Sequence, residues 1–497
     1  MQIFHTKVRV TPDALRSHIQ VKFSVPEGLE YLTVATFYSP KYEYDEKKCA
    51  KLVRECLEKY APYREFSYEE IRRNFPLANH IAWSLHDGEK QLGTEHRHKP
   101  DQTHVISEKY SSNGFIETKV RAGEWTLTAS INSIVTDFID IDVTVEGFTE
   151  KRDFPTEKYD SELYAVNDCE KGKLTWQRVE MHCHTVASDG DMTPKELVQN
   201  AIKRGYKGIC LTDHNTVSDV KAVEEWGKKY NLAVARGIEW TTFWGHLTVI
   251  GGNSKVNWLD IRPENINACI VQARQSGDIV TLAHPKRIGW PLCAGCYNDF
   301  GITNWDYLTS YEVWSHYDPN VSLADLQAKR EWISLLDKGY RLAAMYGYDW
   351  HSPDEGGPSY AYTYLGIDGI LDKDSIVKAV ECGRTYITMG WEINVELCDG
   401  ENSYGIGDIL PIGRYRLKIS YNKASDYPFD SKLESLSVKG NSCEEYHFAC
   451  AGGKGEIKEE IYLAKEGYMR IEGTGFTEGK YADVLLTSPV YVKEIKK

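Results

Sequence analysis

The stretch MHCHTVASDGDMTP, residues 181–194, decides the fold of the middle of the chain. His182 and His184 flank Cys183 at the end of a short apolar run, which indicates a β-strand. In an extended segment, residues two positions apart point to the same side, so both imidazoles can reach one metal ion. Asp189 follows in the same stretch. The pattern indicates a strand whose end carries candidate metal ligands.

A helix is predicted directly after this stretch. Thr193 is the expected N-cap, Pro194 takes the first helical position and Glu196 closes a capping box. Gly205 marks the expected end. Further helices are predicted at 263–275, at 322–337 with Ser322 as cap, and at 373–382. Strands that alternate with helices favour β/α units around a parallel sheet or barrel.

Five further apolar runs end in, or contain, a histidine or an acid. They are GICLTDH (208–214), AVARGIE (233–239), DIVTLAHP (278–285), YEVW (311–314) and RLAAMYGYDWH (341–351). In a β/α barrel the carboxyl ends of the strands lie on one face, so these side chains would meet there. Imidazole and carboxylate ligands suit zinc, manganese or iron. His246 precedes its apolar run and reaches this face only if residues 239–250 form a hairpin.

The predicted elements divide the chain into three domains. Residues 1–172 are β-rich, with strands predicted at 18–26, 31–40, 123–132 and 138–147 and a helical insert at 45–61. Residues 173–385 hold the alternating strands and helices, and residues 386–497 return to strands.

Two other groups of residues are interpreted as loops. The polar segment 93–114 contains His96, His98 and His104, which we interpret as residues of a solvated loop. Cys293 and Cys296 form a C-x-x-C without a second pair, which indicates loop thiols.

Composition limits the partners that we expect. The 497 residues carry a net charge of −14, which disfavours nucleic acid and anionic membranes and leaves a small-molecule substrate. No run approaches the ~18 apolar residues of a membrane span, and the N-terminus does not resemble a signal peptide. Twelve scattered cysteines favour a reducing, cytoplasmic location. The oligomeric state is left open.

Five motifs, HCHTVASDG, TDH, GIE, AHP and GYDWH, resemble in order those of the PHP superfamily, named for polymerase and histidinol phosphatase. The resemblance covers residues 176–385. It implies an α/β fold, a distorted (β/α)7 TIM-like barrel that holds two or three divalent ions of zinc, manganese or iron. The β-rich flanks, expected to be sandwich-like, are similar to the CehA/McbA-like branch of metallohydrolases.

The same resemblance implies the metal ligands. In order, they are His182, His184 and Asp349 for a first ion, Glu239 as a bridge, His246 and His284 for a second ion, and Asp189, His214 and His351 for a third.

Several of these roles have alternatives. Asp189 could instead cap the turn at Gly190. Asp213 is interpreted as orienting a ligating histidine. Glu312 is either close to the site or a structural carboxylate, and His316 either contacts substrate or lies in a solvated loop.

The expected function is that of a metal-dependent hydrolase. Two metals about 3.5–4 Å apart can share a water and lower its pKa, which makes a bridging hydroxide the nucleophile. The candidate catalytic residues are Glu239, His246, His284 and Arg287. His246, His284 or a metal-bound water would give the leaving group its proton.

Residues beside the motifs suggest the substrate. Lys286 and Arg287 follow His284, and a guanidinium can grip phosphate through two parallel bonds, which favours a small phosphorylated substrate. Aromatic residues also lie beside the motifs and could form a substrate wall or pack between domains. They are Trp240, Phe243, Trp244, Trp290 and Trp350.

Two other functions remain possible from the sequence. One is hydrolysis of a carboxylic ester, amide or carbamate, as in the CehA/McbA-like branch, which does not need Lys286 or Arg287. The other is a non-catalytic, metal-containing protein that binds carbohydrate through its β domains.

Overall fold

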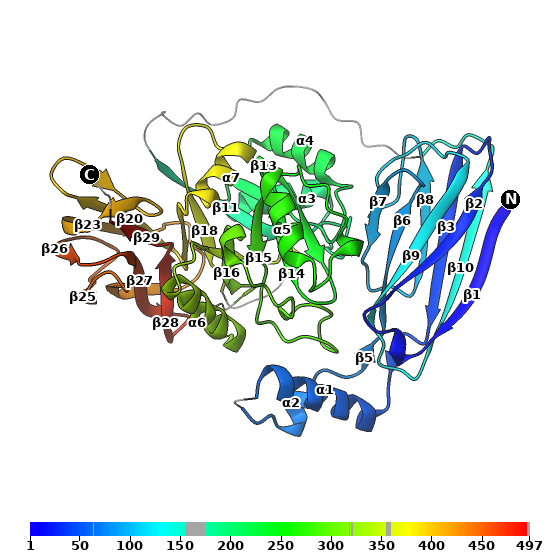
Figure 1. Ribbon diagram of the computed structural model, residues 1–497, viewed down its shortest axis with the longest axis horizontal. Coiled ribbons are helices and arrows are strands. Elements are labelled where there is room, and N and C mark those ends of the chain that lie inside the picture. Colours follow the sequence, from blue (N-terminus) through cyan, green and yellow to red (C-terminus); the bar gives the residue numbers. More distant parts are fainter. Residues whose placement is uncertain (63, 155–173, 318, 320–321, 354–358, 495–497) are drawn as a thin grey trace.

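The computed structural model describes residues 1–62, 64–154, 174–317, 319, 322–353 and 359–494 (Figure 1). Strands are numerous and helices few within these residues, which confirms the mixed α/β class. An N-terminal pair of sheets, a central part with helices and a C-terminal set of sheets lie side by side along the long axis (Figure 1). None of the helices in the described ranges has the length and apolar character that a membrane crossing requires.

Two four-stranded antiparallel sheets face each other in the N-terminal part. Their orders are β1-β10-β3-β8 and β2-β9-β6-β7, and they share one hydrophobic core. The strands are β1 (Gln2–Val10), β2 (His18–Val25), β3 (Tyr31–Ser39), β6 (His80–His86), β7 (Gln91–Glu95), β8 (Asp101–Ser107), β9 (Gly123–Ser133) and β10 (Ile139–Phe148). Buried and more exposed positions alternate along β10, as predicted for 138–147.

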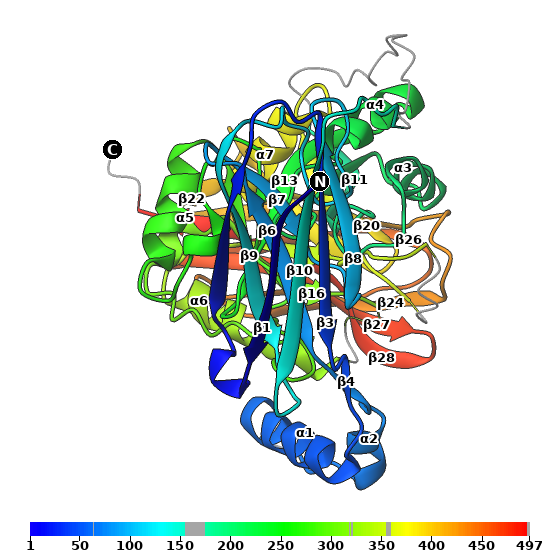
Figure 2. The ribbon, with the colours of Figure 1, turned by 90° about the vertical axis from the view of Figure 1, so that its right-hand side faces the viewer.

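The helical insert predicted at 45–61 is confirmed as α1 (Glu46–Tyr60), which α2 (Tyr68–Arg72) follows. A short pair, β4 (Tyr42–Glu43) and β5 (Leu77–Ala78), brackets these helices. The apolar face of α1 packs on Ile288, Trp290 and Leu292 of the central part. The insert therefore joins the N-terminal sheets to a loop of the central part, below the sheets in Figure 2.

The prediction of a solvated loop at 93–114 is wrong. Strands β7 and β8 occupy much of this segment, and β7 is almost entirely buried. Its polar side chains are paired across the sheet, as Thr94 is with Ser84 at 2.7 Å between the hydroxyl oxygens. A polar sequence therefore did not mean an exposed segment, because cross-strand hydrogen bonds satisfied the polar groups.

Seven strands of the central part are hydrogen-bonded in series, with helices between them. The strands are β11 (Thr175–Cys183), β12 (Gly208–Leu211), β13 (Ala233–Thr241), β14 (His246–Ile250), β15 (Ile279–Leu282), β16 (Ser310–Ser315) and β17 (Ala343–Gly347). The helices are α3 (Pro194–Lys203), α4 (Val220–Tyr230), α5 (Ile266–Gln275), α6 (Leu323–Asp337) and α7 (Lys373–Glu381). Four of the five helices lie where the sequence predicted them; α4 was not predicted.

Strand β14 is the exception in direction, because it runs antiparallel to both β13 and β15. Thr241 pairs with His246 at the turn between β13 and β14. This is the hairpin that the sequence required, and it brings His246 back to the end of the sheet where Glu239 lies.

The segment after the last strand of the series is hydrogen-bonded to the end of the first strand. After β17, the Trp350 amide donates to the His182 carbonyl at 3.1 Å, and the His184 amide donates to the Trp350 carbonyl at 2.9 Å. These bonds connect the ends of β11 and β17, beside the candidate ligands His182, His184 and Asp349.

The C-terminal strands continue the central sheet through β18 (Tyr362–Ile367) and β19 (Thr385–Thr388). The others are β20 (Trp391–Cys398), β21 (Ser403–Tyr404), β22 (Ile409–Pro411), β23 (Gly413–Lys423), β24 (Ser431–Gly440), β25 (Tyr446–Ala449), β26 (Lys454–Leu463), β27 (Gly467–Thr477), β28 (Lys480–Thr487) and β29 (Val490–Lys493). One hydrophobic core contains residues from Cys183 to Val492. The predicted boundary at 385/386 falls within β19, and that at 172/173 lies outside the described residues; the domain division stays a prediction.

Replacing Thr193 with alanine should lower the free energy of unfolding by about 0.5–2 kcal/mol. The Glu196 amide donates to Thr193 Oγ1 at 3.3 Å, and the Thr193 amide donates to the Glu196 carboxylate at 2.9 Å. The change removes the first of these bonds and leaves an amide of the first turn without its acceptor. The urea unfolding transition measures the effect.

Ser322→Ala is the matched control. Ser322 stands at the N-cap of α6, but its side chain accepts no capping hydrogen bond from the described part of that helix. We expect this variant to unfold at nearly the wild-type urea concentration. Equal destabilisation by the two substitutions would contradict a specific role for the capping box.

Candidate metal centre

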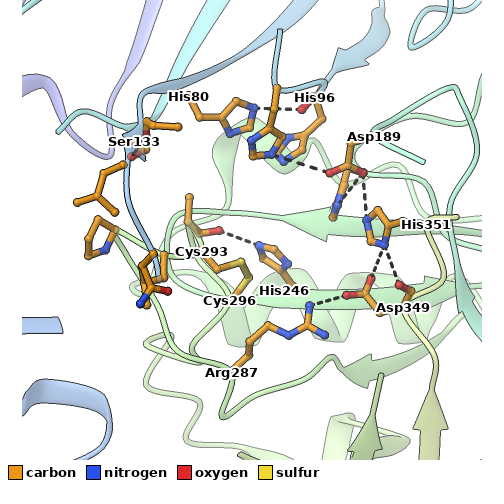
Figure 3. Close-up of a pocket in the computed structure, with 18 of the residues that line it drawn as sticks. His80, His96, Ser133, Asp189, His246, Arg287, Cys293, Cys296, Asp349 and His351 are labelled. Atoms are coloured by element: carbon orange, nitrogen blue, oxygen red, sulfur yellow. Dashed lines mark hydrogen bonds and ion pairs between the residues drawn. A yellow bond between two sulfur atoms is a disulfide. The ribbon is translucent and has the colours of Figure 1, made fainter. Parts of the chain in front are cut away.

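The carboxyl ends of the central strands face a cavity of about 340 Å³ (Figure 3). The central part contributes a set of ligand-type side chains to its wall: Asp189, His214, His246, His284, Asp349 and His351. The N-terminal part contributes His80, His96, His98 and Ser133. The cavity therefore lies between two parts of the chain that are far apart in sequence.

Four ligand atoms of the central strands form a compact group, all of them buried. Nε2 of His182 lies 3.2 Å from Glu239 Oε2 and 3.2 Å from Asp349 Oδ1. Nε2 of His184 lies 3.5 and 3.0 Å from the same two oxygens. Ligands about 2.1 Å from a tetrahedral ion are roughly 3.4 Å apart. The four atoms therefore enclose a space of the size that such an ion needs.

The other oxygen of Glu239 faces a second pair of histidines. Oε1 lies 3.0 Å from His246 Nδ1 and 3.2 Å from His284 Nε2. One carboxylate thus contacts both groups of imidazoles, which is the arrangement expected of a residue that bridges two ions.

A third group lies on the side of the cavity nearer the N-terminal sheets. Asp189 Oδ1 lies 3.4 Å from His214 Nε2 and 3.2 Å from His351 Nε2. His184 shares this group, with all its ligand atoms within 4.8 Å of one another. Asp189 therefore faces two histidines, which is the arrangement that a metal ligand requires. It also precedes Gly190 in the turn after β11.

Hydrogen bonds behind the ligands fix which ring nitrogens face the cavity. His182 Nδ1 lies 2.8 Å from Glu312 Oε1, and His246 Nε2 lies 3.2 Å from the Ala294 carbonyl. A carbonyl or carboxylate only accepts, so each of these nitrogens carries the proton and the other keeps its lone pair. Glu312 also accepts from the His284 amide at 2.7 Å. Glu312 thus positions two of the candidate ligands.

Asp213 holds His184 through Ser188. Ser188 Oγ donates to Asp213 at 2.7 Å and lies 3.3 Å from His184 Nδ1. The Thr185 amide and hydroxyl also donate to Asp213, both at 2.7 Å. This network lies directly behind the ligand, where the sequence placed Asp213.

The backbone is strained at two of the candidate ligands. His284 has φ 25° and Asp349 has φ 55°, in the left-handed region that residues with a Cβ rarely adopt. Such strain persists only where the surroundings impose it, and it is concentrated at functional sites. Both turns direct a side chain into the same cavity.

The electrostatic environment favours the charge states that bind cations. Burial alone would raise the pKa of Glu239 and of Asp349, but the surrounding histidines hold both well below their ordinary values. Burial and the neighbouring His351 and His214 rings lower the pKa of His184 to about 3. Burial opposes a proton on His182, yet the nearby carboxylates raise its pKa, so a proton and a cation compete for that ring.

Buried polar atoms without partners test whether the residues fit divalent metals. Such atoms, which have no hydrogen-bond partner in the described ranges, include His182 Nε2, Asp189 Oδ1, Glu239 Oε2 and His246 Nδ1. A buried polar group that lacks a partner costs about 1–3 kcal/mol. Imidazole and carboxylate atoms are ligands for zinc, manganese and iron. The residues present therefore fit a cluster of divalent ions.

Arg287 and Lys286 are separated by the fold. The Arg287 guanidinium lines the cavity and bonds Asp349 Oδ2 at 2.5 Å. Lys286 is not among the described residues that line it, because its ammonium pairs with Glu331 at 2.9 Å. Of the two predicted phosphate contacts, Arg287 therefore lies at the cavity and Lys286 does not.

Other residues that the sequence singled out also lie away from the cavity wall. His316 contacts the Tyr348 carbonyl at 3.3 Å instead. Among the residues with described positions, the five aromatic residues beside the motifs do not line the wall either. Trp240, Phe243 and Trp350 are almost fully buried, which supports the packing interpretation.

Two interpretations of the sequence are corrected at this wall. Cys293 and Cys296 are joined in a disulfide, with Cα atoms 5.5 Å apart, and are not loop thiols. His96 is buried beside His214, with ring centroids 4.5 Å apart, and His98 lies beside Asp189. His80 was not among the residues predicted to lie at the site. The available signal in the sequence was its position at the start of the apolar run HIAWSLH, which forms β6.

Comparison with known proteins agrees with this geometry. Residues 180–282 match the family model of the PHP domain. A 5'-3' exoribonuclease of Haemophilus influenzae is 34% identical over 68 residues, 14% of this chain and 25% of that protein. A phosphoribosyl 1,2-cyclic phosphate 1,2-diphosphodiesterase of Eggerthella lenta is 32% identical over 60 residues, 12% of this chain and 23% of that protein. The chain thus spans about a quarter of these relatives.

One solved structure is similar over a longer range. It is a two-domain protein of Bacteroides vulgatus containing a predicted PHP-like metal-dependent phosphoesterase. It has 16% sequence identity and a TM-score of 0.37, and the match covers 67% of this chain and 100% of that one.

Replacing Glu312 with glutamine should weaken metal binding by roughly 10–100-fold. The carboxylate accepts from His182 Nδ1, and an amide in its place would orient the ring less firmly and make its free nitrogen less basic. Titration of metal-free protein against a chromophoric chelator measures the affinity.

Glu331→Gln is the control, since Glu331 pairs with Lys286 outside the ligand groups. Its metal affinity should equal that of the wild type. A Glu312→Gln variant with wild-type affinity would show that Glu312 does not position a ligand.

Proposed function

We propose that this protein is a metal-dependent hydrolase of the phosphoesterase type, acting on a small phosphorylated compound. The observation that carries the proposal is a carboxylate-bridged set of ligands with a guanidinium beside it on one cavity wall. Glu239 faces two groups of imidazoles, and Arg287 bonds the ligand Asp349 from the cavity side. The PHP domain match supports the same class.

The ligand groups would hold two or three divalent ions, of zinc, manganese or iron. Ions bound there would lower the pKa of water toward neutrality and offset negative charge on the substrate's oxygens. The residues that would hold them are His182, His184, Glu239 and Asp349 for the first ion, Glu239, His246 and His284 for the second, and His184, Asp189, His214 and His351 for the third.

Arg287 is the residue that we assign to substrate binding. A guanidinium has five N–H donors in a fixed plane, so it can bond Asp349 and a phosphate oxygen together. Burial opposes its charge, but the adjacent Asp349 raises the pKa of Arg287, which therefore stays cationic. Its position on the cavity wall supports a substrate that carries a phosphoryl group next to the ligands.

We assign His246 and His284 as ligands and not as proton donors. Each directs a ring nitrogen at Glu239 Oε1, and a nitrogen that binds a cation there carries no proton. The second nitrogen of His246 is engaged by the Ala294 carbonyl. The leaving-group proton would then come from elsewhere on the cavity wall.

The size and charge of the protein favour a small substrate. A cavity of about 340 Å³ is at the lower end of the usual range for small-molecule sites. The chain has a net charge of −14, which opposes close approach of a long polyanion. We therefore do not extend the exoribonuclease activity of the Haemophilus influenzae relative to this protein.

We infer that β11–β17 form a closed, distorted (β/α)7 barrel, because the ends of β11 and β17 are hydrogen-bonded through Trp350. Sheets before and after the PHP domain support a place in the CehA/McbA-like branch.

The test compares a phosphate ester with a carboxylic ester of the same leaving group. Arg287→Ala should lower kcat/KM for p-nitrophenyl phosphate by about 10²–10³-fold, the usual loss when a donor to developing charge is removed. Hydrolysis of p-nitrophenyl acetate should change little. Both rates are measured with Mn²⁺, Zn²⁺ and Fe²⁺, together with the metal content of each protein.

Lys286→Ala is the matched control, because Lys286 pairs with Glu331 away from the cavity. It should keep the wild-type rates. If Arg287→Ala lowers both activities equally at unchanged metal content, Arg287 does not recognise phosphate. If the wild type hydrolyses only the carboxylic ester, the phosphoesterase proposal is wrong.

A further inference from the structure

Three histidines of the N-terminal sheets lie together at the cavity but outside the PHP domain. His80 begins β6, and His96 and His98 follow β7. Strands β6 and β7 are antiparallel neighbours in which Trp83 pairs with Glu95. If the same register continues by three residues on each strand, His80 lies opposite His98. The cluster is thus built by the sheet itself.

The three rings are packed closely enough to share one ligand. The ring centroids of His80 and His98 are 3.9 Å apart and nearly parallel, and those of His80 and His96 are 4.6 Å apart. One nitrogen of each ring lies within 4.8 Å of the others. Ligands of a tetrahedral zinc ion are roughly 3.4 Å apart, so small side-chain movements complete the geometry.

In two of the three rings, hydrogen bonding leaves one nitrogen with a lone pair that can bind a metal ion. His80 Nε2 lies 3.0 Å from the His96 carbonyl, which can only accept, so this nitrogen carries the proton and Nδ1 is available as a ligand. His96 is 7% exposed, and its Nδ1 is buried without a hydrogen-bond partner in the part of the chain that the structure describes. Burying such an atom is unfavourable unless something binds it.

A carboxylate faces the trio from the PHP domain. Asp189 Oδ2 lies 4.0 Å from His98 Nε2, while Oδ1 of the same group faces His214 and His351. Figure 3 shows His80 and His96 on the same side of the cavity as Asp189. The trio is therefore open to the cavity, with an anionic oxygen on its open side.

We propose that His80, His96 and His98 bind a further transition-metal ion of the Zn²⁺ type, with Asp189 Oδ2 beside its open position. Three imidazoles and one open position form a set that suits zinc, while magnesium prefers oxygen ligands. The ion would connect the N-terminal sheets to the PHP domain across the cavity. The site does not depend on the proposed phosphoesterase activity.

The experiment counts zinc ions. Metal-free wild type, His80→Gln and His98→Gln are loaded with Zn²⁺, desalted and measured by elemental analysis. Each variant should retain about one ion fewer than the wild type. Loading with Co²⁺ gives a second readout, because loss of an imidazole ligand changes its visible absorption. The side chain of His98 is 58% exposed, so His98→Gln tests the proposal even where His80→Gln fails to fold.

Two control variants separate this site from the central one. His86→Gln changes a histidine of the same strand outside the trio and should bind as much zinc as the wild type. Glu239→Gln should lose central ions and keep the ion at the trio. The zinc count does not depend on hydrolysis, so failure of the proposed function would not affect it.

Two results would overturn the proposal. If His80→Gln and His98→Gln hold as much zinc as the wild type and His86→Gln, no ion binds at the trio. If their zinc content is unchanged and the KM for the phosphate ester rises, the histidines contact substrate and not metal.

Discussion

The buried carboxylate of Glu239 is the constraint on which the rest of the centre depends. It is completely buried at the end of β13, and its two oxygens lie within 3.5 Å of ring nitrogens from separate strands. A charge taken out of water is tolerated only when it is paired with protons or cations. The convergence of the strand ends supplies that pairing. Two of the converging segments pass through left-handed backbone conformations, at His284 and at Asp349.

The N-terminal part completes the cavity. Helix α1 packs on the loop that follows His284, a candidate ligand, and Cys56 Sγ contacts the Gly289 carbonyl at 3.5 Å. The sheets then bring His80 and His96 to the side of the cavity opposite Arg287. The cavity therefore lies between a wall of the central part and a wall of the N-terminal sheets.

Much of the site could be predicted because its residues stand in local patterns. His182, His184 and Asp349 occur at strand ends, where alternation and capping residues locate the strand and the helix after it. The hairpin needed for His246 could be stated in advance for the same reason. The prediction failed at 93–114, where polar residues were interpreted as exposed. Cross-strand pairs such as Ser84 with Thr94 are not visible before the strands are paired. Lys286 and Arg287 lie in the loop after β15, and only packing decides which of two adjacent loop side chains faces the cavity.

By itself, the sequence determined the alternation of strands and helices in the middle of the chain, the ligand types at the strand ends and the PHP-like order of motifs. These follow from periodicity and spacing within a few residues. Only the tertiary structure decided that His80, His96 and His98 lie at the centre, that Glu312 positions His182, and that Arg287 and not Lys286 faces the cavity. The contact between Cys56 and Gly289 spans 233 residues of sequence. Packing at that separation is set by the burial of complementary surfaces, which leaves no local pattern in the chain.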